Sequence, residues 1–286
     1  MSRQRVKLEV FAAADGEQVV SQMSSTRAPA VAGYFYPEDS AELESAVAGY
    51  LAAVPTPPSN APVPKALIVP HAGYVYSGPV AASGYARIAG QRQTIRRVVL
   101  LGPSHRIPLR GLAASGADAF DTPLGAVPLD REVIDEILDF PQVQILEAAH
   151  RDEHSLEVQL PFLQYVLEDF SLVPLSVGDA EPEEVGEVIE RLWGGPETLF
   201  VVSSDLSHYH DYDTARRLDA ATTRAIEALD AHALEPESAC GRAPACGLLA
   251  AAKRHGLSVE TVDLRSSGDT AGDKQRVVGY GSYVFT

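Results

Sequence analysis

The chain has 286 residues, of which 45% are hydrophobic and 22% charged, and its formal net charge is −16 at pH 7. This composition is typical of a globular protein with a substantial core, and so strong a negative charge argues against binding to nucleic acid or to an anionic membrane. The sequence has no run of about 18 apolar residues, and its basic start lacks the apolar stretch of a signal peptide, so we expect a cytoplasmic protein.

The N-terminal stretch differs in composition from the rest of the chain. Around residues 14–25 the sequence is polar, rich in small residues and without a hydrophobic pattern. Residues 1–26 are therefore predicted to be a poorly structured extension, and residues 27–286 to form one domain.

The domain begins with an extended segment and a helix. Residues 27–37 (RAPAVAGYFYP) combine two prolines, a glycine and three aromatic residues, which favours an extended conformation. Residues 38–53 have helical spacing after a cap at Asp39 or Ser40. Five prolines then make residues 54–64 a linker rather than a helix or a central strand.

Further along, short apolar runs alternate with segments of helical spacing. Strands are predicted at residues 66–69, 98–101, 143–146, 172–177, 198–203, 257–264 and 276–285. Helices are predicted from Gly78-Pro79 onward and at residues 130–140, 153–168, 182–192, 214–229 and 243–255. This alternation predicts a single-domain α/β sandwich around a central, mostly parallel or mixed sheet. No glycine-rich dinucleotide or P-loop motif follows any of the strands.

Two histidines come directly after predicted strands. His71 follows the strand at residues 66–69, and His105 follows the strand at residues 98–101. Each alone is equally compatible with a surface loop. Their separation is 105 − 71 = 34 residues, about one βαβ unit, and ligands of α/β sheets bind at the carboxyl ends of the strands. We therefore expect the two imidazoles to lie close together.

Three further polar residues are candidates for catalysis. Asp205 and His208, in SSDLSHYH, follow the strand at residues 198–203, and a three-residue spacing would place them on one side of a helical turn. The carboxylate could then hold the imidazole as a base or help to bind a metal; the alternative is an N-cap aspartate beside an exposed histidine. His154, in RDEHSLE, could orient a substrate or transfer a proton, or could simply lie at a helix N-terminus capped by Asp152 or Ser155.

The two cysteines, Cys240 and Cys246, would close a very short loop, so no disulfide is expected. Cys246 lies in the apolar run ACGLLAAA and is predicted to be a small buried residue. Imidazole and thiolate are ligands of zinc, copper and iron, and two histidines with one carboxylate are typical of non-haem Fe(II) oxygenases. The strand-end histidines could meet either Asp205 or Cys240 as an anionic third ligand.

Six stretches, taken together, resemble one known family. RAPAVAGYFYP, ALIVPHAGYVYSG, VVLLGPSHR, DEHSLEVQLPFLQ, FVVSSDLSH and ACGRAP, in this order from residue 27 to about residue 244, resemble the Memo family, called AmmeMemoRadiSam system protein B in bacteria. The resemblance implies a fold like that of the class III extradiol (LigB-type) dioxygenases. It also implies a metal pocket of His71, His105 and Cys240. Asp205 and His208 match its further pocket residues, and His208 is similar in placement to the dioxygenase base.

The expected function is metal binding in a dioxygenase-like pocket. Fe(II) is the first candidate and copper or zinc are alternatives, with the protein acting as an oxidoreductase on a phenolic or related small molecule. In that hypothesis His208 is the acid or base, His154 orients the substrate, and Asp205 is an additional ligand or supports one. Because a cysteine replaces the carboxylate of the dioxygenases, the alternative is a non-catalytic metal- and partner-binding module with a vestigial pocket. Zinc-dependent hydrolysis is a third option. The expected partners are a small-molecule or peptide ligand in the pocket and, from the resemblance, AMMECR-type and radical-SAM proteins.

Overall fold

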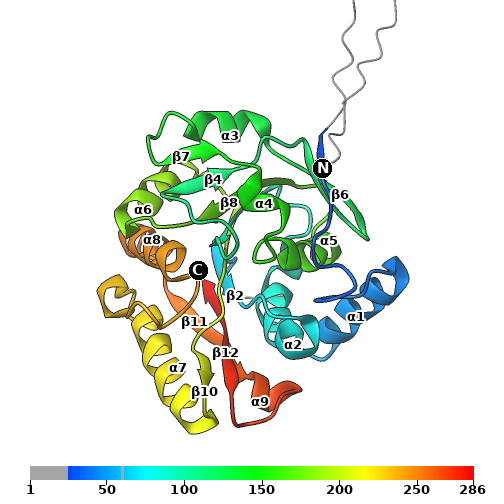
Figure 1. The fold of residues 1–286 in the computed structure, drawn as a ribbon, viewed down its shortest axis with the longest axis vertical. Coiled ribbons are helices and arrows are strands. Elements are labelled where there is room, and N and C mark those ends of the chain that lie inside the picture. Colours follow the sequence, from blue (N-terminus) through cyan, green and yellow to red (C-terminus); the bar gives the residue numbers. More distant parts are fainter. Residues whose placement is uncertain (1–24, 59–60) are drawn as a thin grey trace, which may run out of the picture.

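A large mixed sheet and a small second sheet carry the fold of residues 25–58 and 61–286, which the computed structural model describes (Figure 1). The large sheet consists of β2 (Ala66–Val69), β3 (Arg97–Pro103), β4 (Leu112–Ala114), β7 (Val143–Ile145), β8 (Ser171–Val177), β9 (Thr198–Ser203), β10 (His208–His210), β11 (Val259–Ser266) and β12 (Val277–Phe285). The small sheet consists of β1 (Thr26–Arg27), β5 (Ala119–Thr122) and β6 (Gly125–Pro128). Residues 1–24 of the expected extension lie outside the described residues.

The centre of the large sheet is parallel. Its order is β10-β12-β2-β9-β3-β8-β4-β7, and β11 pairs with the outer edge of β12. The four strands β2, β9, β3 and β8 run parallel, whereas β12 and β4 flank them in the antiparallel sense. Every residue of β2 and β9 is buried, as expected for strands covered on both faces. The predicted α/β sandwich with a mixed sheet is confirmed.

Helices cover both faces of this sheet. The longer ones are α1 (Ser40–Ala52), α2 (Tyr74–Tyr85), α6 (Pro182–Arg191), α7 (Tyr212–Glu227) and α8 (Arg242–Arg254). The shorter ones are α3 (Arg131–Ile137), α4 (Ala148–Arg151), α5 (Leu160–Val166), α9 (Ser267–Thr270) and the 3₁₀ turns Ala86–Gln91, Glu157–Gln159 and Ala231–Ala233. Figure 1 shows α6, α7 and α8 on one side and α1, α2 and α5 on the other. In the part of the chain that the structure describes, no helix is both long and apolar enough to cross a bilayer.

The start of α2 differs from the prediction. The helix begins at Tyr74, and Pro79 lies inside it rather than in its first turn. The first helical N–H, that of Tyr74, is satisfied by the carbonyl of Phe35, a residue distant in sequence. Pro79 cannot donate to the carbonyl of Val75, but Val75 is 59% exposed, so water can take the place of that bond. The tertiary contact with Phe35, invisible in the local pattern, sets the boundary.

The helix predicted over residues 153–168 is shorter than expected. A turn and the 3₁₀ segment Glu157–Gln159 precede α5, and Pro161 lies at the first positions of that helix. Pro161 has no N–H for the carbonyl of Glu157, so one α-helical bond is missing there, although Gln159 and Leu160 keep helical backbone angles. Residues 153–156 form a loop and turn at the carboxyl end of β3.

Candidate metal centre

Three parallel strands end at the site, and His71, His105 and Asp205 follow their last residues. β9 lies between β2 and β3, so the strands that carry His71 and His105 are not direct neighbours as their βαβ spacing suggested. Their carboxyl ends nevertheless lie at the same edge, together with the end of β9, where Asp205 follows. The edge of the sheet where ligands are expected is therefore where the candidate residues gather.

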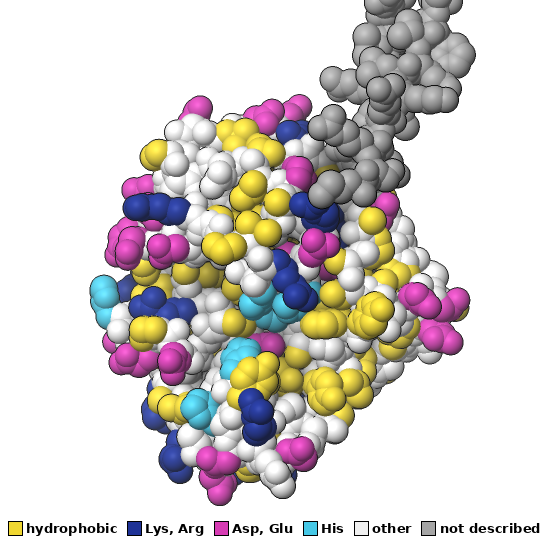
Figure 2. Space-filling view, viewed as in Figure 1, with side chains coloured by type: hydrophobic (Ala, Val, Ile, Leu, Met, Phe, Trp, Pro, Cys, Tyr) yellow, Lys and Arg dark blue, Asp and Glu magenta, His cyan; other side chains and the backbone are white. Residues whose placement is uncertain are grey.

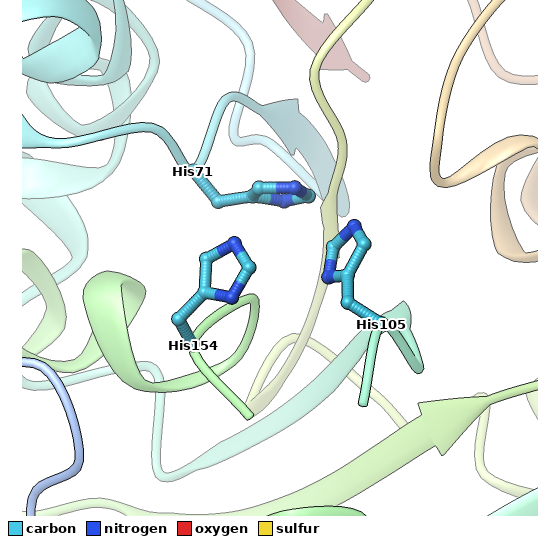
Figure 3. Close-up of side chains that lie close together, drawn as sticks. All are labelled: His71, His105 and His154. Atoms are coloured by element: carbon cyan, nitrogen blue, oxygen red, sulfur yellow. The ribbon is translucent and has the colours of Figure 1, made fainter. Parts of the chain in front are cut away.

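His71, His105 and His154 form a compact group. One ring nitrogen from each lies within 4.8 Å of the other two. The ring centroids are 5.3 Å apart for His71 and His105, 5.5 Å for His71 and His154, and 4.7 Å for His105 and His154. Figure 3 shows the three imidazoles pointing toward one another from separate segments. In Figure 2, histidine side chains reach the surface near the centre of this face.

Two of the three histidines, His71 and His154, have lowered pKa values. His71 is 2% exposed, and burial, followed by the neighbouring His154 and His105, lowers its pKa well below the usual value. Burial also lowers the pKa of His154 to about 4, against the opposing influence of Glu153. The buried Nδ1 of His154 makes no hydrogen bond, although Glu153 Oε1 lies 3.3 Å from it. Neutral imidazoles with free nitrogens are the form that binds iron, copper and zinc, so the donor set fits a transition metal.

Glu153 organises the loop that carries His154. Its buried carboxylate accepts hydrogen bonds from the backbone N–H of His105 (2.6 Å), from His105 Nδ1 (3.0 Å), and from the N–H groups of His154 and Ser155 (2.9 Å each). Burial alone would raise its pKa, but these bonds, that from the His105 side chain foremost, hold it at about 2. Because an ionised carboxylate only accepts, His105 Nδ1 carries the proton of this hydrogen bond, which leaves Nε2 as the ring nitrogen that faces a ligand.

Cys240 lies at the edge of the histidine group. Its Sγ is 3.3 Å from His71 Nε2 and accepts from the N–H of Asp205 at 3.3 Å. Burial, and then the charge of Asp205, raises the pKa of the thiol to about 12. Cys240 is therefore in contact with His71 but outside the compact group of three histidines. Cys246, by contrast, is fully buried, as predicted.

Asp205 and His208 are not paired on a helical turn. Residues 204–207 form a loop, and His208 begins strand β10, so the expected geometry is wrong. Asp205 instead accepts from the backbone N–H of His71 at 2.8 Å, and burial raises its pKa to about 7. His208 is half-buried, and its pKa is lowered mainly by burial, with a smaller effect of His105. Asp205 thus fixes the turn after β2, while His208 lies within electrostatic range of the histidine group.

The comparison with known proteins agrees with the six motifs. The model of the family described as Memo-like protein matches residues 27–284. The chain belongs to the Memo family. A MEMO1 family protein of Aquifex aeolicus is 38% identical over 273 residues, covering 91% of this chain and 98% of that protein. MEMO1 family proteins of Metallosphaera sedula and Methanosarcina barkeri are 35% and 37% identical, covering 89% and 90% of this chain and 97% and 99% of theirs.

In this Memo-family chain, the sequence pattern does not reveal the residues that hold the candidate histidines by hydrogen bonds. Glu153 is less obvious as a cap than its neighbours Asp152 and Ser155, yet Asp152 is exposed and meets only Arg151, at 3.9 Å. A glutamate beside a histidine was the available signal. Nothing in the pattern points to Ser203, which is hydrogen-bonded to His71, or to Gln159, which donates to Ser203.

Proposed function

We propose that this Memo-family protein is a cytoplasmic, non-haem metal-dependent oxidoreductase, with Fe(II) as first candidate and copper or zinc as alternatives, acting on a phenolic or related small molecule. The observation that carries the proposal is the group of His71, His105 and His154, whose ligand nitrogens lie within 4.8 Å of one another. His71 and His105 would hold the ion, and His154 or Cys240 would complete the set. The place of His154 in this group supports a role toward an ion or a substrate.

When bound, such an ion would lower the pKa of a phenolic hydroxyl held beside it and supply the redox chemistry. The remaining steps belong to the protein. His208, whose pKa is lowered by burial, is uncharged at neutral pH and would accept the phenolic proton. Asp205 fixes the backbone of His71, and the ring of Phe35 covers one side of His154 at a centroid distance of 4.9 Å.

The proposal is tested first by metal content. Protein purified without added metal is analysed for iron, copper and zinc, and compared with His71→Ala and with His255→Ala as a control, since His255 packs on Trp193 away from the site. The metal should be lost only in His71→Ala. Anaerobic reconstitution with Fe(II) and oxygen-consumption assays over a catechol panel then test turnover. A fully metallated protein that turns over no diphenol would refute the ring-cleavage chemistry.

A second function is favoured by the contact between Cys240 and His71. A thiol in place of the dioxygenase carboxylate suits a protein that binds metal and a partner without catalysis. AMMECR-type and radical-SAM proteins are the partners to test. Under this alternative, Cys240→Ser abolishes tight metal binding, the unsubstituted protein has no oxygenase activity, and association with the partner persists in pull-down experiments. Turnover by the metallated protein would rule this alternative out.

A further inference from the structure

A chain of buried hydrogen bonds runs from the core to His71. Tyr85 donates to Gln159 Oε1 at 2.9 Å, Gln159 Nε2 donates to Ser203 Oγ at 2.7 Å, and Ser203 Oγ lies 2.9 Å from His71 Nδ1. All four side chains are at most 2% exposed. Because no water can substitute for a missing partner here, the protons in this chain must be assigned consistently.

The orientation of the Gln159 amide is fixed by its surroundings. Its Nε2 lies 2.9 Å from the carbonyl oxygen of Pro70, which can only accept. That atom is therefore the NH₂ group, and its two hydrogens go to Pro70 O and Ser203 Oγ. Gln159 cannot accept a proton from Ser203, so the serine hydroxyl must donate elsewhere.

Ser203 has one proton and two remaining neighbours. The carbonyl of Ser155 lies 2.6 Å from its oxygen, and His71 Nδ1 lies 2.9 Å away. If the hydroxyl donated to His71, two oxygens would face each other at 2.6 Å without a proton between them, and the buried carbonyl would lose its partner. The proton therefore goes to Ser155 O, and Ser203 can only accept from His71.

We propose that Ser203, held by Gln159, is a positioning residue that locks His71 in the Nδ1–H tautomer, so that Nε2 is presented as a free lone pair before any metal arrives. This inference rests on the proposed metal site and adds the residues that prepare it. Glu153 has the same effect on His105, whereas His154 Nδ1 lies 3.3 Å from Glu153 Oε1 without making a hydrogen bond. The site thus has two preset ligand atoms, on His71 and His105. The contact of Cys240 Sγ with His71 Nε2 does not set the direction of that bond, because the thiol can also donate to the carbonyl of Asp205 at 3.6 Å.

The tautomer is measured directly by NMR. Full-length, metal-free protein labelled with ¹⁵N at histidine gives long-range ¹H–¹⁵N spectra, in which His71 is assigned by its loss in His71→Gln. We expect His71 with a protonated Nδ1 and an unprotonated Nε2. A protonated Nε2, or a mixture of tautomers, would overturn the inference. This measurement needs no metal, and it needs no variant at Ser203.

Variants test the role of Ser203 itself. Ser203→Ala should convert His71 to a mixture of tautomers, leave His105 unchanged, and weaken binding of Fe(II) or Zn(II) by about 10–100-fold. Ser176→Ala is the matched control, because Ser176 is equally buried in the sheet and its hydroxyl has no partner. An unchanged His71 tautomer in folded Ser203→Ala would contradict the inference. The expected tautomer in a protein that binds no metal would refute the proposed function alone.

Discussion

The buried ion pair between Arg27 and Glu157 anchors the N-terminal segment beside the site, and breaking it should be costly. The two side chains are 5% and 0% exposed. Glu157 also accepts from the N–H groups of Ala30 (2.7 Å) and Val31 (3.0 Å) and from the hydroxyl of Tyr36. Arg27→Met would leave a carboxylate in the interior without its counterion.

Removing one partner of a buried pair costs roughly 3–5 kcal/mol. We place Arg27→Met near the lower bound, at about 3 kcal/mol, because three neutral donors remain on Glu157. The substitution also takes a donor from the carbonyls of His150 and Glu153, to which Arg27 Nε and Nη2 donate. Against a total of about 5–15 kcal/mol for a domain, this is a large fraction of the free energy of unfolding.

The assay is urea denaturation of the metal-free protein. Arg92→Met is the control: Arg92 pairs with Glu168 at 3.1 Å, but the two side chains are 54% and 39% exposed, so its loss should cost less than about 1 kcal/mol. The double variant Arg27→Met/Glu157→Gln has no unpaired charge, but its amide NH₂ cannot replace both acceptor oxygens of Glu157, so its loss should be smaller than the sum of the two single losses. The reasoning fails if Arg27→Met is no more destabilising than Arg92→Met, or if the losses of the two single variants simply add.

Three further predictions concern pH, metal and close packing. Burial lowers the pKa of His150 to about 4, so the unfolded chain binds this proton at a higher pH than the folded protein does, and the free energy of unfolding should fall by about 3 kcal/mol from this group as the pH drops from about 6.5 to 4. The urea midpoint of His150→Gln should depend less on pH than that of the unsubstituted protein. An equal dependence would contradict the lowered pKa. A metal ion at 100 times its Kd should stabilise the protein by about 2.7 kcal/mol in the same titration, and His105→Ala should lose that gain whereas His255→Ala should keep it. In Gly241→Ala, the new Cβ would meet Ser203 O at 2.8 Å, so the free energy of unfolding should fall by about 1–3 kcal/mol. Gly49→Ala, which has open space around the new Cβ, should raise it by about 0.5–1 kcal/mol. Thermal unfolding compares the two variants, and equal effects would refute the argument from packing.

The secondary structure was predictable where local signals are strong. The strand at residues 198–203 has the predicted bounds, because its apolar run is closed by polar residues at both ends. Helix α1 starts after Asp39, whose carboxylate accepts from two backbone N–H groups of the first turn. Strand order was less accessible, since the insertion of β9 between β2 and β3 depends on pairing between segments more than 90 residues apart.

The loop around residues 153–156 could not be derived from the pattern. Its leucine spacing favours a helix, but in the fold Glu153 turns inward and collects four hydrogen bonds, so residues 153–156 form a loop instead. The preference of a glutamate for water is overcome here because every bond to its carboxylate is supplied by neighbouring residues. Only the folded contacts with His105 reveal this, so a residue that supports the site escapes prediction although its neighbour His154 was identified.

The sequence offered Asp205 or Cys240 as a third ligand beside the two strand-end histidines, and the structure adds His154 to these candidates. Ser203 occupies Nδ1 of His71, so an ion can bind that ring only through Nε2, and Cys240 Sγ lies 3.3 Å from the same atom. Any ion held by His71 therefore meets this sulfur or displaces it. Burial raises the pKa of the thiol to about 12, so at neutral pH a sulfur ligand forms only where the metal replaces its proton. The three-histidine group and the predicted set of two histidines and a cysteine would thus both place the ion at His71 Nε2, next to Cys240 Sγ. A soft ion such as Cu(I) would favour the sulfur, whereas Fe(II) and Zn(II) are well served by the imidazoles.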